Sequence, residues 1–145
     1  MRIVSLTKKD ETQIIALDKA CYVNYDLPAI TPGEVDELVR NGFMLGVMEN
    51  GRLVSDILVF YKKPGEWFLW GIATVPEMQG QGFATALLKD VLKRAKEKRV
   101  KVCVSIRPGN EKSLGLFRKH GFVEKGLVKD FCGPGIDRLI FESPE

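Results

Sequence analysis

The stretch TVPEMQGQGFAT, residues 74–85, joins an apolar segment to an amphipathic one through a turn of very small residues. Gly80, Gly82 and Ala84 carry almost no side-chain bulk, so the backbone N–H groups of this turn can approach a ligand closely. The periodic segment that follows predicts a helix whose positive N-terminal end points at the same place. The turn is therefore predicted to bind a phosphate or pyrophosphate, with the hydroxyl of Thr85 as a further donor.

Two nucleotide-binding motifs are disfavoured by the same stretch. A P-loop needs Gly-Lys followed by Ser or Thr, and the sequence has no such triplet. A dinucleotide fold needs a third small residue and an acidic residue at the end of the next strand, but residue 85 is Thr and residues 101–106 contain no Asp or Glu. A purely structural interpretation, a tight turn where a helix packs closely on a strand, stays open.

Length and composition predict one compact domain over residues 1–145, with 45% hydrophobic residues to form its core. The 22 basic and 19 acidic residues give a net charge of +3, too little for a typical nucleic-acid binder. Cys21, Cys103 and Cys132 are widely spaced, so neither a disulfide framework nor a metal site is expected. Without a signal region or a long apolar run, we expect a cytoplasmic monomer or homodimer with no membrane partner.

Cap and turn residues divide the chain into alternating elements. Thr7 and Thr31 each begin a capping-box pattern, Asn24 and Pro28 are turn and breaker residues, and Asn50-Gly51 predicts a tight hairpin. Strands are expected at residues 2–6, 43–49, 52–61, 66–75, 101–106, 122–131 and 136–141, and helices near 7–22, 31–41, from 83 onward and at 110–120. The long helix after residue 83 predicts that strands 66–75 and 101–106 are parallel.

This order of elements resembles the GNAT superfamily of acetyl-CoA-dependent N-acetyltransferases, and the resemblance covers essentially the whole chain. Residues 79–84 are similar to the family's pyrophosphate loop, residues 72–74 with Pro76 to the strand beside the pantetheine arm, and residues 110–117 with Gly121-Phe122 to the second cofactor segment. The resemblance implies an α/β (α+β) fold, a mixed central sheet of about seven strands with about four helices. It also implies acetyl-CoA as cosubstrate, no metal, and a cofactor-binding set of Ile72, Ala73, Thr74, Gln79, Gly80, Gln81, Gly82, Phe83, Ala84, Thr85, Asn110, Ser113 and Phe117.

Three acid or base positions of the family are empty in this sequence. The usual tyrosine is Phe117, and the usual glutamates are Ser105 and Phe68. Glu66, two residues from Phe68, is the remaining candidate for a general base, unless it is only an exposed strand-end charge. Asp56, inside an apolar strand, is expected either to bind a substrate amine or to pair with a basic residue.

The acceptor side is the least specified part of the sequence. The resemblance places Tyr25 and Asp26 in an interhelical loop that walls the acceptor site, so both are candidate substrate contacts. Residues 129–138 resemble the closing hairpin of protein N-terminal acetyltransferases, which slightly favours a protein or peptide amine over a small-molecule amine. The predicted function is transfer of an acetyl group to a primary amine by direct attack. The alternative is a CoA-binding sensor or pseudoenzyme without turnover.

Overall fold

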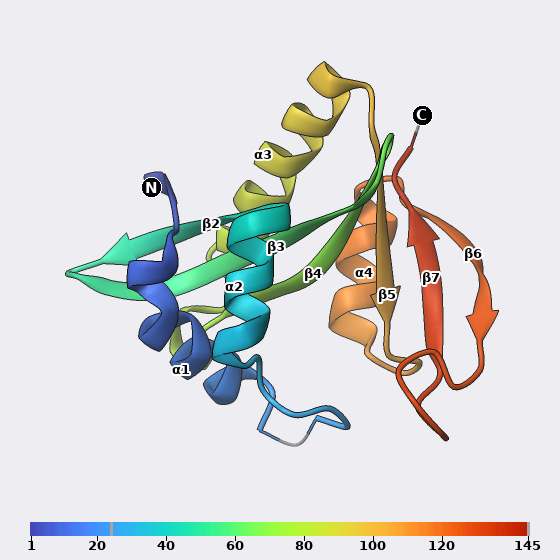
Figure 1. The fold of residues 1–145 in the computed structure, drawn as a ribbon, viewed down its shortest axis with the longest axis horizontal. Helices are drawn as coiled ribbons and strands as arrows, with labels where there is room; N and C mark the ends of the chain where they lie inside the picture. Colours follow the sequence, from blue (N-terminus) through green and yellow to red (C-terminus); the bar gives the residue numbers. More distant parts are fainter. Residues whose placement is uncertain (24, 145) are drawn as a thin grey trace.

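The computed structural model describes residues 1–23 and 25–144. The turn expected at Asn24 lies outside these residues. Figure 1 shows a single twisted sheet of seven strands in the order β1-β2-β3-β4-β5-β7-β6. The strands are β1 (Ile3–Ser5), β2 (Gly42–Glu49), β3 (Arg52–Lys63), β4 (Glu66–Thr74), β5 (Lys101–Ile106), β6 (Val123–Val128) and β7 (Arg138–Glu142). Within the described chain, β4 and β5 form the one parallel pair, as predicted.

Four α-helices cover this sheet, and their N-terminal caps follow from the sequence. They are α1 (Glu11–Cys21), entered through a 3-10 turn at Lys8–Asp10, α2 (Pro32–Asn41), α3 (Phe83–Lys98) and α4 (Glu111–Lys119). Thr7 and Thr31 both form reciprocal capping boxes, which confirms the predicted starts. The Asn110 side chain accepts a hydrogen bond from the Ser113 amide at 3.3 Å and so caps α4.

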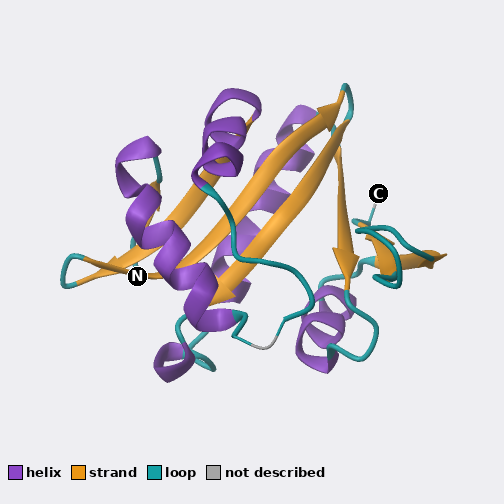
Figure 2. Cartoon of the chain, turned by 60° about the horizontal axis from the view of Figure 1, so that its bottom comes forward, coloured by secondary structure: helices purple, strands orange, loops and turns teal. Residues whose placement is uncertain are grey.

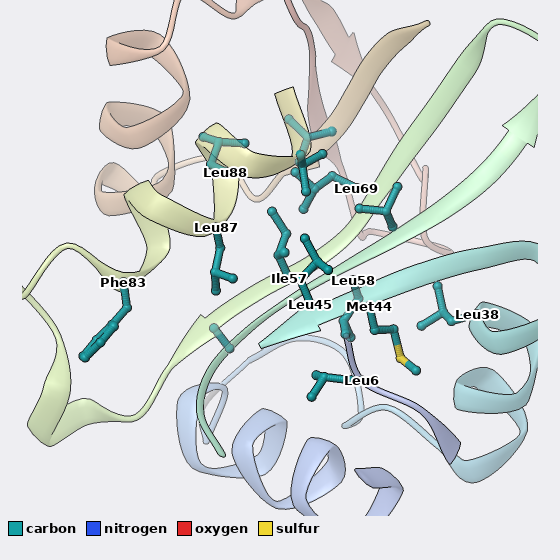
Figure 3. Close-up of a cluster of buried hydrophobic side chains, with 14 of the residues drawn as sticks. Leu6, Leu38, Met44, Leu45, Ile57, Leu58, Leu69, Phe83, Leu87 and Leu88 are labelled. Carbon is teal, nitrogen blue, oxygen red and sulfur yellow. The ribbon is translucent and has the colours of Figure 1, made fainter. Parts of the chain in front are cut away.

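The hairpin between β2 and β3 also follows from local chemistry. Asn50 and Gly51 have φ angles of 51° and 78°, the conformation that a two-residue turn with two left-handed positions requires. Successive apolar residues of β3 point to opposite faces of the sheet, and both faces are buried. Figure 3 shows Leu87 and Leu88 of α3 packing on one side of the central strands, and Leu6 and Leu38 on the other. In Figure 2, α1 and α2 lie over one face of β2–β4, while α3 lies over the opposite face.

The sheet divides where β4 and β5 separate. The two strands pair only between Glu66–Leu69 and Lys101–Val104. Trp70 is the extra residue of a β-bulge, because Val59 pairs with Leu69 while the adjacent Leu58 pairs with Gly71. A bulge bends its strand and increases the local twist. The bulge therefore accompanies the loss of pairing with β5 and opens the sheet at its centre.

The closing hairpin differs from the predicted strands of residues 122–131 and 136–141. The strands are shorter, and β7 lies between β5 and β6. The connection is longer because Asp130 folds it: the Asp130 carboxylate accepts from the Gly135 amide at 2.6 Å, and the Asp130 amide donates to the Asp137 carboxylate at 2.9 Å. These local hydrogen bonds replace strand pairing, as is common for Asp in loops.

Candidate functional site

A cleft of about 1110 Å³ begins where β4 and β5 separate. It continues into a smaller cavity of about 60 Å³, with which it shares Tyr22, Tyr25, Ile72, Arg107, Asn110 and Ser113. Most of the predicted cofactor residues line the large cleft: Ile72, Ala73, Thr74, Gln79, Gly80, Gly82, Phe83, Ala84, Thr85, Asn110 and Ser113. Gln81 does not, and its side-chain nitrogen lies 3.9 Å from the Met78 sulfur instead. The first and last of these residues, Ile72 and Ser113, are 41 positions apart in the sequence, so the fold brings them together in this cleft.

The glycine turn faces open space. Gly80 and Gly82 have φ angles of 82° and 87°, and a Cβ atom at either position would meet nothing within 4 Å. Close packing of helix on strand therefore does not explain these glycines. Gly82 is the N-cap of α3, which has no side-chain cap and no acidic residue in its first turn. Its first N–H groups are thus available to an anion in the cleft.

Lys112 adds a positive charge to the cleft that the sequence analysis missed. This residue lies in the first turn of α4 and lines the cleft. Its ammonium group donates to the Gln79 side-chain carbonyl at 3.1 Å, and the Gln79 amide nitrogen donates to the Thr74 carbonyl at 3.1 Å. Gln79 therefore links the end of β4 to α4, and Lys112 is held beside the glycine turn. A single exposed lysine gives no signal in sequence.

Two side chains from the end of α1 reach the free edge of β4. The Tyr22 hydroxyl donates to the Ile72 carbonyl at 2.6 Å, and the Cys21 thiol donates to the Thr74 carbonyl at 3.0 Å. Burial raises the pKa of Tyr22, and it raises the pKa of Cys21 to about 11, so both groups keep their protons at neutral pH. These contacts join residues about 50 positions apart, and no local pattern predicts them.

The smaller cavity contains two of the three positions where the family has its acids and bases, and the third, Phe68, lines neither cavity. Phe117 and Ser105 both line the smaller cavity, together with the exposed Trp70 at the bulge. Phe117 is buried and packs edge to face on Phe122, with ring centroids 5.0 Å apart. Unlike most of the predicted cofactor set, Phe117 lines the small cavity and not the large cleft. No carboxylate lines this cavity among the described residues.

Arg138 and Asp26, which come from distant segments, form an ion pair next to Tyr25. Arg138, at the start of β7, is 1% exposed and binds both carboxylate oxygens of Asp26, at 2.7 and 3.0 Å. The hydrogen bond to Arg138 lowers the pKa of Asp26. The Tyr25 ring lies 5.1 Å from the Arg107 guanidinium and 5.4 Å from that of Arg138. Tyr25 lines both cavities, whereas Asp26 lines neither. The Asp26 carboxylate instead accepts two hydrogen bonds from Arg138.

Glu66, the candidate general base, lines neither cavity. Glu66 begins β4, whereas the cleft opens at the other end near Thr74, about 26 Å away along an extended strand. The Glu66 carboxylate lies 3.5 Å from Lys62 and 3.4 Å from Lys101. Burial acts to raise the pKa of Glu66, but these lysines outweigh it and the pKa is lowered. Glu66 is a structural ion-pair partner.

Asp56 fits neither role that the sequence left open. It is 3% exposed, lines neither cavity, and has no Lys or Arg within 4 Å among residues 1–23 and 25–144. Burial, with a smaller contribution from Asp18, raises the pKa of Asp56 well above its usual value. Burial of a carboxyl without a neighbouring cation favours its protonated form.

Residues 1–23 and 25–144 contain no cluster of three or more His, Cys, Asp or Glu side chains able to hold a metal ion. Of the helices described, none has the length and apolar character needed to cross a membrane.

Comparisons with known proteins agree with this geometry. The sequence profile described as the Acetyltransferase (GNAT) family matches residues 12–122. No curated protein sequence matches the chain significantly. Solved structures with a similar fold include the ribosomal-protein-S18-alanine N-acetyltransferase from Escherichia coli, with a TM-score of 0.84, 19% identity, and coverage of 99% of this chain and 92% of that one.

Two further structures share the fold. The ribosomal-protein-alanine N-acetyltransferase from Brucella melitensis has a TM-score of 0.82 at 19% identity, with both chains fully covered at 100%. A GNAT family acetyltransferase from Elizabethkingia anophelis, solved with acetyl-CoA bound, has a TM-score of 0.76 at 18% identity over 99% of this chain and 97% of that one. At these identities the likeness establishes the fold.

Proposed function

Because this chain belongs to the GNAT acetyltransferase family, and is by that membership an acetyl-CoA-dependent N-acetyltransferase, we propose that it acetylates a primary amine by direct attack at the small cavity. One observation carries the proposal. An unobstructed glycine turn at the start of α3 opens into a cleft that continues to Ser105 and Phe117. The cleft thus combines an anion site with an enclosed space at the gap between β4 and β5.

The residues of the cleft suit acetyl-CoA. The amides that follow Gly82 and the ammonium group of Lys112 would hold the pyrophosphate. The pantetheine arm would lie along residues 72–74 in the manner of an added strand. The carbonyls of Ile72 and Thr74 already accept hydrogen bonds from α1, which leaves their N–H groups as the donors for the arm.

The transfer itself needs little from the side chains. The amine nitrogen forms a bond to the acetyl carbon, the carbon–sulfur bond breaks, CoA departs as a thiolate, and the attacking nitrogen loses a proton. Because no carboxylate lines the small cavity, we propose that water removes this proton and that positioning supplies much of the rate.

The acceptor is proposed as a primary amine, either a protein N-terminus or a small molecule. Two structures with this fold come from ribosomal-protein-alanine N-acetyltransferases, which supports the first option. The loss of the family's acid and base positions supports a rival, a CoA-binding protein without turnover. Incubation with acetyl-CoA and a panel of amines and peptides, followed by measurement of free thiol, separates the two. Thiol release that depends on an amine supports the enzyme, whereas tight CoA binding in calorimetry without release supports the rival.

We also propose that the chain acts as a single cytoplasmic domain, a monomer or homodimer, without nucleic-acid or membrane partners. The modest net charge of +3 supports the exclusion of nucleic acid. Light scattering coupled to size-exclusion chromatography measures the oligomeric state. A mass above that of two chains would contradict the proposal.

A further inference from the structure

In the part of the chain that the structure describes, Arg107 is the one charged residue that lines the small cavity. The rest of its described lining is aromatic, apolar, hydroxyl or amide, with Tyr25, Trp70 and Ser105 among the residues nearest to solvent. Arg107 lines the large cleft as well, so it stands where the two spaces meet. A molecule that passes from the large cleft into the small cavity therefore comes close to Arg107.

The charge of Arg107 is not matched inside the protein. Among the described residues no carboxylate lies within 4 Å of it, Asp26 interacts with it only at longer range, and its guanidinium lies 5.1 Å from the centre of the Tyr25 ring. Arg138, on the same ring at 5.4 Å, is neutralised by both oxygens of Asp26. One net positive charge thus remains at the mouth of the cavity, and an arginine held over an aromatic face presents its N–H groups to an anion.

This charge selects among acceptors. A polyamine or an aminoglycoside would bring further positive charges to a site with no carboxylate to receive them. An acceptor with an anionic group beside its amine would instead pair with Arg107, and the neighbouring cation would favour the neutral, nucleophilic form of that amine. The small cavity, at about 60 Å³, has room for little beyond the acetyl group and the amine. The rest of the acceptor must lie outside, against Arg107 and Trp70.

We propose that Arg107 is an anion-binding subsite for the acceptor, and that the acceptor is a small primary amine bearing a carboxylate, such as an amino acid. This inference rests on the proposed acetyltransferase function. It narrows the acceptor from any primary amine to one chemical class. Tyr25 contacts Arg107 through its ring, and Arg138, which is fixed by Asp26, lies against the same ring.

The test compares each amino acid with its own amide, for example leucine with leucinamide and phenylalanine with phenylalaninamide. Thiol release from acetyl-CoA gives kcat/KM for each, with spermidine and an alanine-initiated peptide as further acceptors. We expect the wild-type protein to favour the acid over the amide by about 10-fold or more, the ordinary contribution of a charge-assisted hydrogen bond. Spermidine and the peptide should be poorer acceptors than the amino acids.

Substitutions of Arg107 test whether its guanidinium causes the preference for the acid over the amide. Arg107→Gln should lower kcat/KM for the acid about 10- to 100-fold and leave the amide nearly unchanged, so that the preference disappears. Arg107→Lys should retain part of it. Arg40→Gln, on the exposed face of α2, is the matched control and should behave as the wild type. A thermal melt of each variant establishes that it is folded.

A binding measurement gives a readout independent of turnover. Calorimetry of the amino acid against the protein saturated with CoA, which has no acetyl group to transfer, should show the same preference and the same loss in Arg107→Gln. Equal use of acid and amide, equal loss of both in Arg107→Gln, or a peptide that exceeds the amino acids would overturn the subsite while leaving acetyl transfer intact. If no amine gives thiol release, the proposed function fails, and the subsite fails with it.

Discussion

Phe117 stands where many members of the family have the tyrosine that protonates the departing CoA thiolate. The family's usual tyrosine hydroxyl is missing here, and the Phe117 ring lines the small cavity while packing on Phe122. A CoA thiol is acidic enough to leave without a strong acid, so a bound water can serve in its place. The cost relative to a well-placed acid is on the order of 10²-fold or less. This makes the residue a direct probe of the mechanism.

Restoring the hydroxyl should therefore raise turnover. In Phe117→Tyr we expect kcat to increase by up to about 10²-fold while KM for acetyl-CoA stays nearly constant, because the added group acts mainly in the transition state. Steady-state kinetics with a fixed acceptor, and a thermal melt for folding, provide the measurement. A large loss of activity in a folded variant would mean that the position has no room for an acid beside the sulfur.

Asp56 makes stability depend on pH with a predictable sign. Its pKa is raised in the folded protein by burial, so folding takes up a proton at any pH between its unfolded and folded pKa values. Stability is full below the unfolded pKa and falls as pH rises, by about 1.4 kcal/mol per pH unit, until the folded pKa is passed. The Asn side chain of Asp56→Asn resembles the protonated acid and has no proton to lose, so the free energy of unfolding of this variant does not fall in the same way as pH rises.

The variant Asp56→Asn should therefore be more stable than the wild type at pH 7. The difference should shrink steadily as pH falls, and it should vanish near pH 4, close to the ordinary pKa of an aspartate. Urea unfolding at several pH values measures it. A difference that stays constant with pH would show that Asp56 is ionised in the folded protein.

At the scale of elements, the glycine turn and the start of α3 form one unit. Gly82→Glu adds bulk and a negative charge where the pyrophosphate is proposed, and it also strains a residue with φ of 87°. Gly51→Glu provides a matched control, because Gly51 has φ of 78°, open space around it, and a position in the β2–β3 hairpin away from the cleft lining. Both variants should lose similar stability. In calorimetry only Gly82→Glu should lose CoA binding, and unchanged affinity in that variant would refute the pyrophosphate assignment.

Elements with a local cause could be predicted from the sequence, and contacts between distant elements could not. The caps at Thr7 and Thr31 and the Asn50-Gly51 hairpin rest on neighbouring residues, and all of them are confirmed. The bulge at Trp70 depends on how β4 pairs with β3, and no residue pattern specifies it. The position of Glu66 relative to the cleft could not be predicted for a similar reason. Its spacing to Phe68 suggested a shared face of β4, but gave no information on which end of the strand the cleft occupies.

The Asp26–Arg138 pair is the extreme case of a contact without a local signal. Its partners are 112 residues apart, and each residue alone looks like an ordinary surface charge. The pair exists because β7 inserts between β5 and β6, which brings its first residue beside the loop after α1. The small cavity and the charges around it thus depend on how distant strands are arranged in the sheet. The glycine turn that faces the large cleft depends on residues that are neighbours in the sequence.

The sheet of the molecule has two parts. They are joined by four residue pairs between β4 and β5, and beyond these pairs the two strands diverge around the cleft. A ligand that fills the cleft contacts β4 and α3 on one side and α4 on the other, so its binding should stabilise both parts together. At a concentration of 100 times its Kd, such a ligand adds about 2.7 kcal/mol to the free energy of unfolding. For a domain of this size that corresponds to a rise in Tm of about 5 to 10 °C.

Acetyl-CoA should produce this rise, whereas ATP and NAD at the same concentration should produce about half of it or less. Both nucleotides can offer phosphates to the glycine turn, but neither has a pantetheine arm to lie along residues 72–74, so we expect each to bind at least about tenfold more weakly. Thermal melts with acetyl-CoA, ATP and NAD, repeated with Gly82→Glu, measure the difference. A larger shift with NAD than with acetyl-CoA would restore the dinucleotide interpretation of the turn. Equal shifts with all three would mean that the phosphates alone provide the binding and that the edge of β4 contributes nothing.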